Sequence, residues 1–161
     1  MSIMVHYGLF VGPASSAPSF SGSSVLRCAK EPWFVEAKAL AARSIYPDRV
    51  KFSAGGNAAL INPNHMVLNM VDAESPRYFP DEMVNAGLDF ITERFAAGDA
   101  VLVHCNMGIS RSPSMAMLWM FEHGFLDDEF RYAVPQFKKL YKDWMPGNGI
   151  WQYLKARCER V

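Results

Sequence analysis

The stretch 100–123, AVLVHCNMGISRSPSMAMLWMFEH, contains the pattern that decides the fold of this chain. Residues 100–104 are an almost continuous apolar run of strand length, which is typical of a strand buried on both faces of a parallel sheet. A loop containing Gly108 follows, and helical character returns from Ser112 to His123. Because α/β folds place ligands where a buried strand gives way to a helix, this stretch also marks a candidate site.

The rest of the chain continues the alternation of strands and helices. Residues 80–97 form the clearest predicted helix, because Val84, Leu88, Ile91 and Phe95 recur at helical spacing. Further helices are predicted at 32–43, 127–141 and 148–160, with Pro135 expected to kink or divide the second of these. Strands are predicted at 25–29 and 66–71, and residues 3–11 are predicted to be strand-forming with a glycine turn. Residues 46–64 are predicted to be irregular apart from a short strand near residue 50. The pattern predicts an α/β fold: a single three-layer domain over residues 1–161, with a central, mostly parallel sheet flanked by helices.

Composition excludes several classes of function. The 161 residues carry 16 basic and 16 acidic side chains, without the basic excess of a nucleic-acid-binding protein. Three widely spaced cysteines argue against a disulfide framework and for a reducing compartment. The first 20 residues lack the pattern of a secretory signal, and no apolar run reaches the ~18 residues of a membrane span. We therefore expect a cytoplasmic protein that binds neither nucleic acid nor membrane.

The loop between Cys105 and Arg111 has the composition of an anion-binding site. Five residues can curl into a ring with their backbone N–H groups pointing inward, and the N-terminus of the next helix reinforces that nest. Gly108 eases the curl, and the planar fork of Arg111 can bind two phosphate oxygens at once. The predicted phosphate-binding residues are the loop and its arginine: Asn106, Met107, Gly108, Ile109, Ser110 and Arg111. No metal or other cofactor is expected, because the loop itself neutralises the phosphate.

The same nest acts on Cys105. Inward N–H groups, a helix N-terminus and a nearby cation favour a thiolate over a thiol, and a thiolate beneath a bound phosphate is placed for in-line attack on phosphorus. Ser112 is predicted to cap the following helix, with Pro113 at its first position, and His104 to orient the loop. The alternative is a buried thiol and a surface arginine that share a loop by coincidence.

These residues resemble a known signature. The segment 104–112 is similar to the His-Cys-x5-Arg-Ser motif of the cysteine-dependent protein tyrosine phosphatases, and 108–114, GISRSPS, resembles the dual-specificity branch. Further similarity lies in 28–32 (CAKEP), 78–79 (YF) and 146–152 (PGNGIWQ). The resemblance implies the phosphatase fold, a cysteinyl-phosphate intermediate and a general-acid aspartate on a loop about thirty residues before the cysteine.

The leaving alkoxide or phenoxide needs a proton from such an acid. Asp72 matches the position that the resemblance implies, directly after the strand predicted at 66–71. Asp81 is the rival, although in the first turn of a helix it has a simple structural role as a favourable charge. Glu74 is a third candidate, which could position water.

The loop side chains also bear on the substrate. None of those between Cys105 and Arg111 is basic, which favours a monophosphate ester over a substrate with several phosphates. The function expected is a protein phosphatase acting on phosphotyrosine and phosphoserine or phosphothreonine in a phosphorylated protein. The alternatives are a lipid or carbohydrate phosphatase using the same loop, and a non-catalytic phospho-binding module. Cys28, which follows the strand residues 25–27, is either a redox partner of Cys105 or a small buried apolar residue.

Overall fold

The apolar run after residue 100 forms strand β7 (Val101–His104), in which all four residues are buried. The computed structural model describes residues 1–43 and 49–160. Within these residues, seven strands form a sheet in the order β1-β2-β7-β3-β6-β5-β4. The remaining strands are β1 (Ile3–His6), β2 (Leu9–Gly12), β3 (Ser24–Arg27), β4 (Lys51–Ser53), β5 (Ala58–Asn62) and β6 (His65–Leu68).

The sheet is mixed, with a parallel core. Strands β2, β7, β3 and β6 run parallel, while β1, β5 and β4 pair antiparallel at the two edges. The register pairs His104 with Gly12 on one side and with Arg27 on the other, and Arg27 in turn with Val67. The carboxyl ends of the four parallel strands therefore meet at one edge of the sheet, where the loops that follow them converge.

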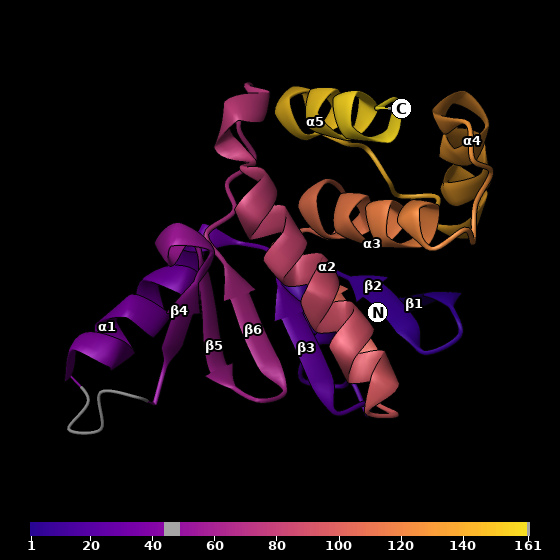
Figure 1. Cartoon of the computed structure of the whole chain (residues 1–161). Helices are drawn as coiled ribbons and strands as arrows, with labels where there is room; N and C mark the ends of the chain where they lie inside the picture. The colour runs from indigo at the N-terminus through magenta and orange to yellow at the C-terminus, as the bar shows by residue number, and fades with distance from the viewer. Residues whose placement is uncertain (44–48, 161) are drawn as a thin grey trace.

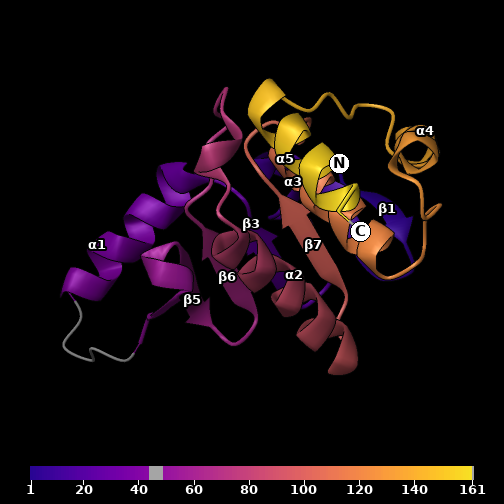
Figure 2. The same cartoon turned by 45° about the horizontal axis from the view of Figure 1, so that its top comes forward.

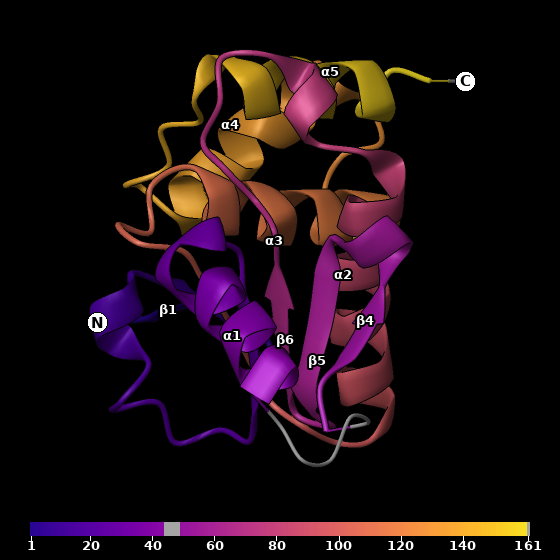
Figure 3. The ribbon, with the colours of Figure 1, turned by 90° about the vertical axis from the view of Figure 1, so that its left-hand side faces the viewer.

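Helices cover both faces of the sheet, as the three-layer prediction required. Helix α1 (Val35–Arg43) lies on one side of the strands, and α2 (Asp81–Ala96) and α3 (Arg111–Glu122) lie on the other (Figures 1 and 3). The last two helices, α4 (Phe130–Leu140) and α5 (Asn148–Cys158), form a further layer beyond α3 (Figures 1 and 2). The expected α/β fold is confirmed.

The core explains why these helices form where they do. Val84, Leu88 and Ile91 of α2 are buried as their spacing predicted, and they share one apolar cluster with α3, α4, α5 and the sheet. Residues 112–120 of α3 are all buried, because this helix lies between the sheet and α5. Among the described residues, no helix is long and apolar enough to cross a membrane.

Two local predictions were wrong. Residues 58–62 form β5, although they lie in the segment expected to be irregular. Alanine-rich sequence has a weak intrinsic strand preference, and this strand is stabilised by pairing with β4 and β6 on its two sides. Of the two outcomes expected at Pro135, a kink or a division of the helix, division is wrong, because α4 is one helix from Phe130 to Leu140 with the exposed Pro135 inside it. Of the 46–64 segment, residues 46–48 lie outside the described part of the chain.

Candidate active site

The site lies at the edge where the parallel strands end. Cys105 follows β7, Cys28 follows β3, and the backbone N–H of Cys28 donates to the carbonyl of His104 (2.7 Å). On the other side of β7, the segment after Gly12 meets the same loop, because the N–H of Ala14 donates to the carbonyl of Asn106 (3.0 Å). The sheet register thus places the cysteine loop between two flanking segments. Figure 2 shows β7 running toward the start of α3 at this edge.

The loop curls around the sulfur of Cys105. The N–H of Gly108 donates to Cys105 Sγ (3.3 Å), and Ser112 Oγ lies 3.2 Å from the same sulfur. Gly108 has φ +72°, and a Cβ on it would meet backbone atoms of Gly12 and Pro13 at 2.6 and 2.5 Å. The curl therefore requires glycine for two reasons, its backbone conformation and the close approach of a second segment.

Hydrogen-bond donors are available inside the ring. Within the described part of the chain, the backbone N–H groups of residues 106, 107, 109 and 110 donate to no protein acceptor. The Arg111 guanidinium is bound to the segment after β6, since its Nη1 donates to the carbonyl of Met70 (3.0 Å). Its Nε is buried and has no hydrogen-bond partner among the described residues. The unpaired loop amides and the buried guanidinium N–H are therefore hydrogen-bond donors that are left for an acceptor from outside the protein.

A hollow of about 250 Å³ opens onto this site, lined by Lys30, Glu31, Val71, Asp72, Asn106 and Arg111. A larger hollow of about 710 Å³ lies at the opposite end of β7, between the β1–β2 turn and aromatic residues of α2 and α3. No residue of the cysteine loop lines the larger hollow, whereas Asn106 and Arg111 line the smaller one.

Ser112 does not have the capping role that the sequence predicted. Helix α3 begins at Arg111, and Ser110 occupies the N-cap position without making a side-chain cap hydrogen bond. Ser112 is fully buried as the second residue of α3, where its hydroxyl lies between Cys105 Sγ and the carbonyl of Gly12 (3.4 Å). The helix begins two residues earlier than predicted, so the hydroxyl contacts the sulfur and does not cap the helix.

Asp72 lies over the cysteine loop. Ser110 Oγ donates to Asp72 Oδ1 (3.0 Å), and the backbone N–H of Gly147 donates to Ser110 Oγ (2.8 Å). Asp72 also lines the hollow beside Arg111. The structure therefore brings Asp72 to the loop from the segment that follows β6. Glu74 lies two residues further on, where its carbonyl accepts from Asn148 Nδ2 (3.4 Å).

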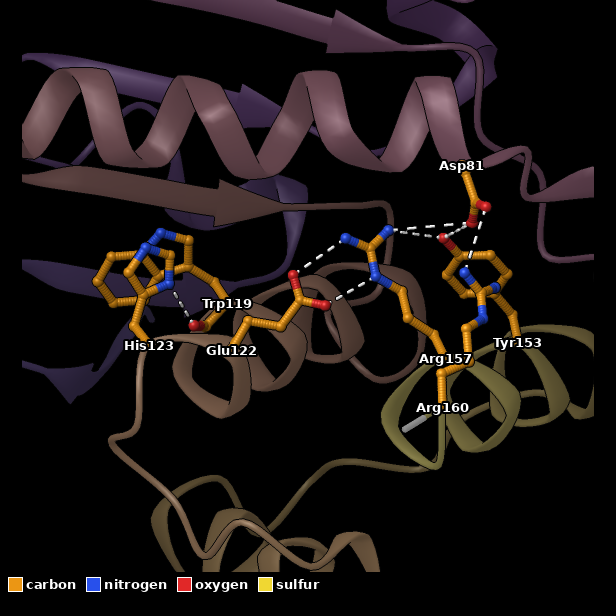
Figure 4. Close-up of polar contacts among 7 residues, drawn as sticks. All are labelled: Asp81, Trp119, Glu122, His123, Tyr153, Arg157 and Arg160. Carbon is orange, nitrogen blue, oxygen red and sulfur yellow. Dashed lines mark hydrogen bonds and ion pairs between the residues drawn. The ribbon is translucent and has the colours of Figure 1, made fainter.

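Asp81, the rival acid, belongs to a different cluster (Figure 4). Its Oδ1 accepts from the Tyr153 hydroxyl (2.7 Å), and its Oδ2 lies 3.4 Å from Arg160 Nη1. The hydrogen bond from Tyr153 lowers the pKa of Asp81, and Arg160 acts in the same direction. Asp81 thus joins the start of α2 to α5 and makes no contact with the cysteine loop among the described hydrogen bonds and ion pairs.

His104 is fully buried beneath the loop. Its Nδ1 lies 3.0 Å from the carbonyl of Cys105, and its Nε2 lies 3.0 Å from Arg27 Nη1. A carbonyl only accepts and a guanidinium only donates, so we assign the proton to Nδ1 and the acceptor role to Nε2. Burial lowers the pKa of His104 to about 4, and the positive charge of Arg27 acts in the same direction. The neutral ring contacts the carbonyl of Cys105 at the start of the loop, and its role in orienting the loop stays a prediction.

Cys28 and Cys105 directly follow Arg27 and His104, which are register partners at the ends of β3 and β7, and both thiols are free. Burial raises the pKa of Cys28 well above its ordinary value, with the nearby Cys105 acting in the same direction. Cys28 therefore stays a neutral thiol beside the site.

Three contacts from the segment after α4 were not predicted. The Tyr141 hydroxyl donates to the carbonyl of Gly108 (2.5 Å), the N–H of Met145 donates to the carbonyl of Ile109 (2.7 Å), and Gly147 reaches Ser110. Burial raises the pKa of Tyr141 to about 12, which keeps its hydroxyl a donor. The similarity of residues 146–152 to the phosphatases was the available signal, but it indicated no contact.

The fold matches solved phosphatase structures over nearly the whole chain. DUSP15 aligns with a TM-score of 0.68 and 16% identity, covering 98% of this chain and 87% of that one. Human DUSP28 aligns with a TM-score of 0.65 and 17% identity, covering 98% of this chain and 93% of that one. The human tyrosine phosphatase-like serine/threonine/tyrosine-interacting protein aligns with a TM-score of 0.66 and 23% identity, covering 97% of this chain and 94% of that one. No family model and no curated protein sequence matches. The chain has the dual-specificity phosphatase-like fold that its sequence resembled.

Proposed function

We propose that this protein is a cysteine-dependent phosphatase that hydrolyses phosphomonoesters of tyrosine and of serine or threonine in proteins. The observation that carries the proposal is the loop at Cys105: its Gly108 N–H donates to Cys105 Sγ (3.3 Å), while four neighbouring loop amides and the buried Nε of Arg111 have no hydrogen-bond partner among the described residues. A phosphoryl group bound there would receive hydrogen bonds from the loop and from Arg111, with the sulfur beneath it.

In the first step the Cys105 thiolate attacks phosphorus in line, and the ester P–O bond breaks as the S–P bond forms. The leaving oxygen takes the P–O electron pair, and Asp72 in its acid form supplies the proton. The products of this step are the dephosphorylated hydroxyl side chain and a cysteinyl-phosphate. Arg111 and the loop amides hold the equatorial oxygens throughout, so the charge of the transferring group stays neutralised.

In the second step water attacks the cysteinyl-phosphate, and Asp72, now a carboxylate, takes a proton from that water. The S–P bond breaks, and its electrons return to Cys105 as a thiolate. The Ser112 hydroxyl, 3.2 Å from Sγ, can turn its proton from the Gly12 carbonyl to the sulfur. A hydrogen bond to the departing thiolate favours its release.

The substrate class follows from the loop and the hollow. No loop side chain between Cys105 and Arg111 is basic, and the rim carries the opposite charges of Lys30 and Glu31. This arrangement supports a monophosphate over a polyphosphorylated lipid. The hollow of about 250 Å³ is small, and Asp72 above it is exposed, which suits a short phosphothreonine as well as phosphotyrosine.

The test is turnover of p-nitrophenyl phosphate, followed by a panel of phosphotyrosine, phosphothreonine and phosphoserine peptides, a phosphoinositide and a phosphoglucan. We expect hydrolysis of the peptides and little of the other two. Cys105→Ser should abolish turnover while phosphopeptide binding remains, since the amides and Arg111 are unchanged. Arg111→Lys should also fail, because a point charge replaces a bidentate fork. Substantial activity of Cys105→Ser would overturn the mechanism, and preference for the lipid or glucan would overturn the substrate class.

A phospho-dependent binding module is the second candidate, because one of the matched structures is named a phosphatase-like interacting protein. The same loop would then bind a phosphorylated side chain without cleaving it. Wild-type protein that binds a phosphopeptide and turns over none of the panel would support this alternative.

A further inference from the structure

We propose that Ser110 and Gly147 are positioning residues that hold Asp72 over the cysteine loop before substrate arrives. The proposal deepens the proposed phosphatase function and rests on it. Its basis is the chain of hydrogen bonds that runs from the Gly147 N–H to Ser110 Oγ (2.8 Å) and from Ser110 Oγ to Asp72 Oδ1 (3.0 Å).

The direction of these two bonds is fixed. A backbone N–H only donates, so Ser110 Oγ must accept from Gly147. The hydroxyl has a single proton, which is then directed to Asp72 Oδ1. One carboxylate oxygen of Asp72 is therefore occupied, while Oδ2 is left to carry the proton that the leaving group receives. Ser110 thus selects which oxygen of the acid faces the substrate.

The Ser110 hydroxyl binds Asp72 and does not cap its own helix. It is the N-cap residue of α3, and a serine there usually accepts from the second or third helical N–H, which stabilises a helix by about 1 kcal/mol. Here no side-chain cap bond is made, and the hydroxyl, only 4% exposed as a residue, is directed to Asp72 instead. A purely structural serine would cap the helix.

Gly147 leaves room for the Asp72 carboxylate beside Ser110. A Cβ on Gly147 would lie 2.6 Å from Asp72 Oδ1, so a glycine is needed for the carboxylate to reach Ser110. Its backbone has φ −64° and ψ 162°, which any residue can adopt. An alanine here would therefore displace the acid without straining its own backbone.

The anchoring matters because Asp72 is in a segment without regular structure between β6 and the turn at Pro76–Tyr78. The segment is fixed at Met70, whose carbonyl accepts from Arg111 Nη1 and from the N–H of Lys30 (2.8 Å). Beyond Met70, the Ser110 bond is what orients the Asp72 carboxylate. A misplacement of about 1 Å can cost on the order of 100-fold in rate.

The experiment compares kcat/KM for phenyl phosphate, whose leaving group needs a proton, with kcat/KM for p-nitrophenyl phosphate, whose leaving group needs little. The ratio kcat/KM covers the reaction only as far as loss of the leaving group, so it leaves out the second step, in which Asp72 acts on water for both substrates. Ser110→Ala and Gly147→Ala should each lower kcat/KM for phenyl phosphate by about 10- to 100-fold and kcat/KM for p-nitrophenyl phosphate by less than about 3-fold. In an Asp72→Asn background, neither substitution should lower kcat/KM for phenyl phosphate further, because the group they position is gone. Asp72→Asn alone should show the same split between the substrates.

Ser114→Ala is the matched control. Ser114 is a buried serine of the same helix turn that accepts from Trp144 Nε1 (3.0 Å), so it contacts the same C-terminal segment but not Asp72. Loss of the Ser114 hydroxyl should change kcat/KM for both substrates by the same factor.

Two outcomes would overturn the inference while leaving the phosphatase function intact. One is equal loss on both substrates in Ser110→Ala and Gly147→Ala. The other is full additivity of these variants with Asp72→Asn. Absence of turnover by the wild type on either substrate would instead overturn the proposed function, and this inference with it.

Discussion

Acidification should destabilise this protein through His104, because the folded chain keeps this ring neutral. The ring is fully buried, Nδ1–H donates to the Cys105 carbonyl, and Nε2 accepts from Arg27. A proton on Nε2 would break the second bond and place a cation against the guanidinium. The pKa is lowered accordingly, from its ordinary 6.5 to about 4.

The sign and size follow from linkage. Between pH 6.5 and pH 4 the unfolded chain binds a proton at this histidine and the folded chain does not, so the free energy of unfolding falls as the pH falls. Above pH 6.5 the ring is neutral in both states and the full stability is present. At 1.36 kcal/mol for each pH unit, the interval from 6.5 to about 4 amounts to roughly 3 kcal/mol.

The assay is urea unfolding of the wild type and of His104→Gln at pH 7.5 and pH 4.5. Glutamine does not titrate, and its amide oxygen can still accept from Arg27. At pH 7.5 the variant should be the less stable, because a packed ring is lost. The difference in free energy of unfolding between the variant and the wild type should shrink by about 2–3 kcal/mol at pH 4.5, since only the wild type loses the stability that its neutral, buried histidine provides. Parallel loss of stability in the two proteins between these pH values would refute the assignment of a neutral, buried His104.

Gly108→Ala should abolish p-nitrophenyl phosphate turnover and lower the free energy of unfolding by more than about 1 kcal/mol, because the new Cβ would overlap the backbone of Gly12 and Pro13. Activity near that of the wild type would show that the loop can adopt a different backbone conformation. Arg157→Gln should lower the free energy of unfolding in urea by about 1–3 kcal/mol. The Arg157 side chain is only 13% exposed and joins α5 to Glu122 of α3 through two hydrogen bonds, of 2.7 and 3.0 Å (Figure 4). Arg160→Gln should lower it by less than about 1 kcal/mol, because the Arg160 side chain is more exposed. Equal effects of these two arginines would contradict the difference in burial. We also propose that Cys28 resolves oxidised Cys105: peroxide converts the Cys105 thiolate to a sulfenic acid, and the Cys28 thiol displaces water from it to form a disulfide. Mass spectrometry after mild peroxide should find the linked peptide, and thiol reductant should restore less activity in Cys28→Ser; no linked peptide and equal recovery would end that idea.

The sequence by itself determined much of the site. Local spacing was enough for β7, the loop and α3, because a buried strand, a glycine turn and a helix leave their marks in contiguous residues. The amphipathic spacing of α2 was equally local. The position of Asp72 came from the phosphatase resemblance, and the strand before it, β6, ends at Leu68 and not at residue 71 as expected. The phosphatase resemblance added the expected fold, which the solved structures match.

Tertiary structure decided what depends on residues far apart in the chain. β5 is a strand because β4 and β6 pair with it, and its alanines carry little preference of their own. Ser112 faces the sulfur because the loop closes against the segment after β2, nearly a hundred residues earlier. The different surroundings of Asp72 and Asp81 likewise rest on long-range partners, Gly147 through Ser110 for the first and Tyr153 for the second. No local pattern encodes such contacts, since each needs two distant segments to be brought together by the sheet and its helices.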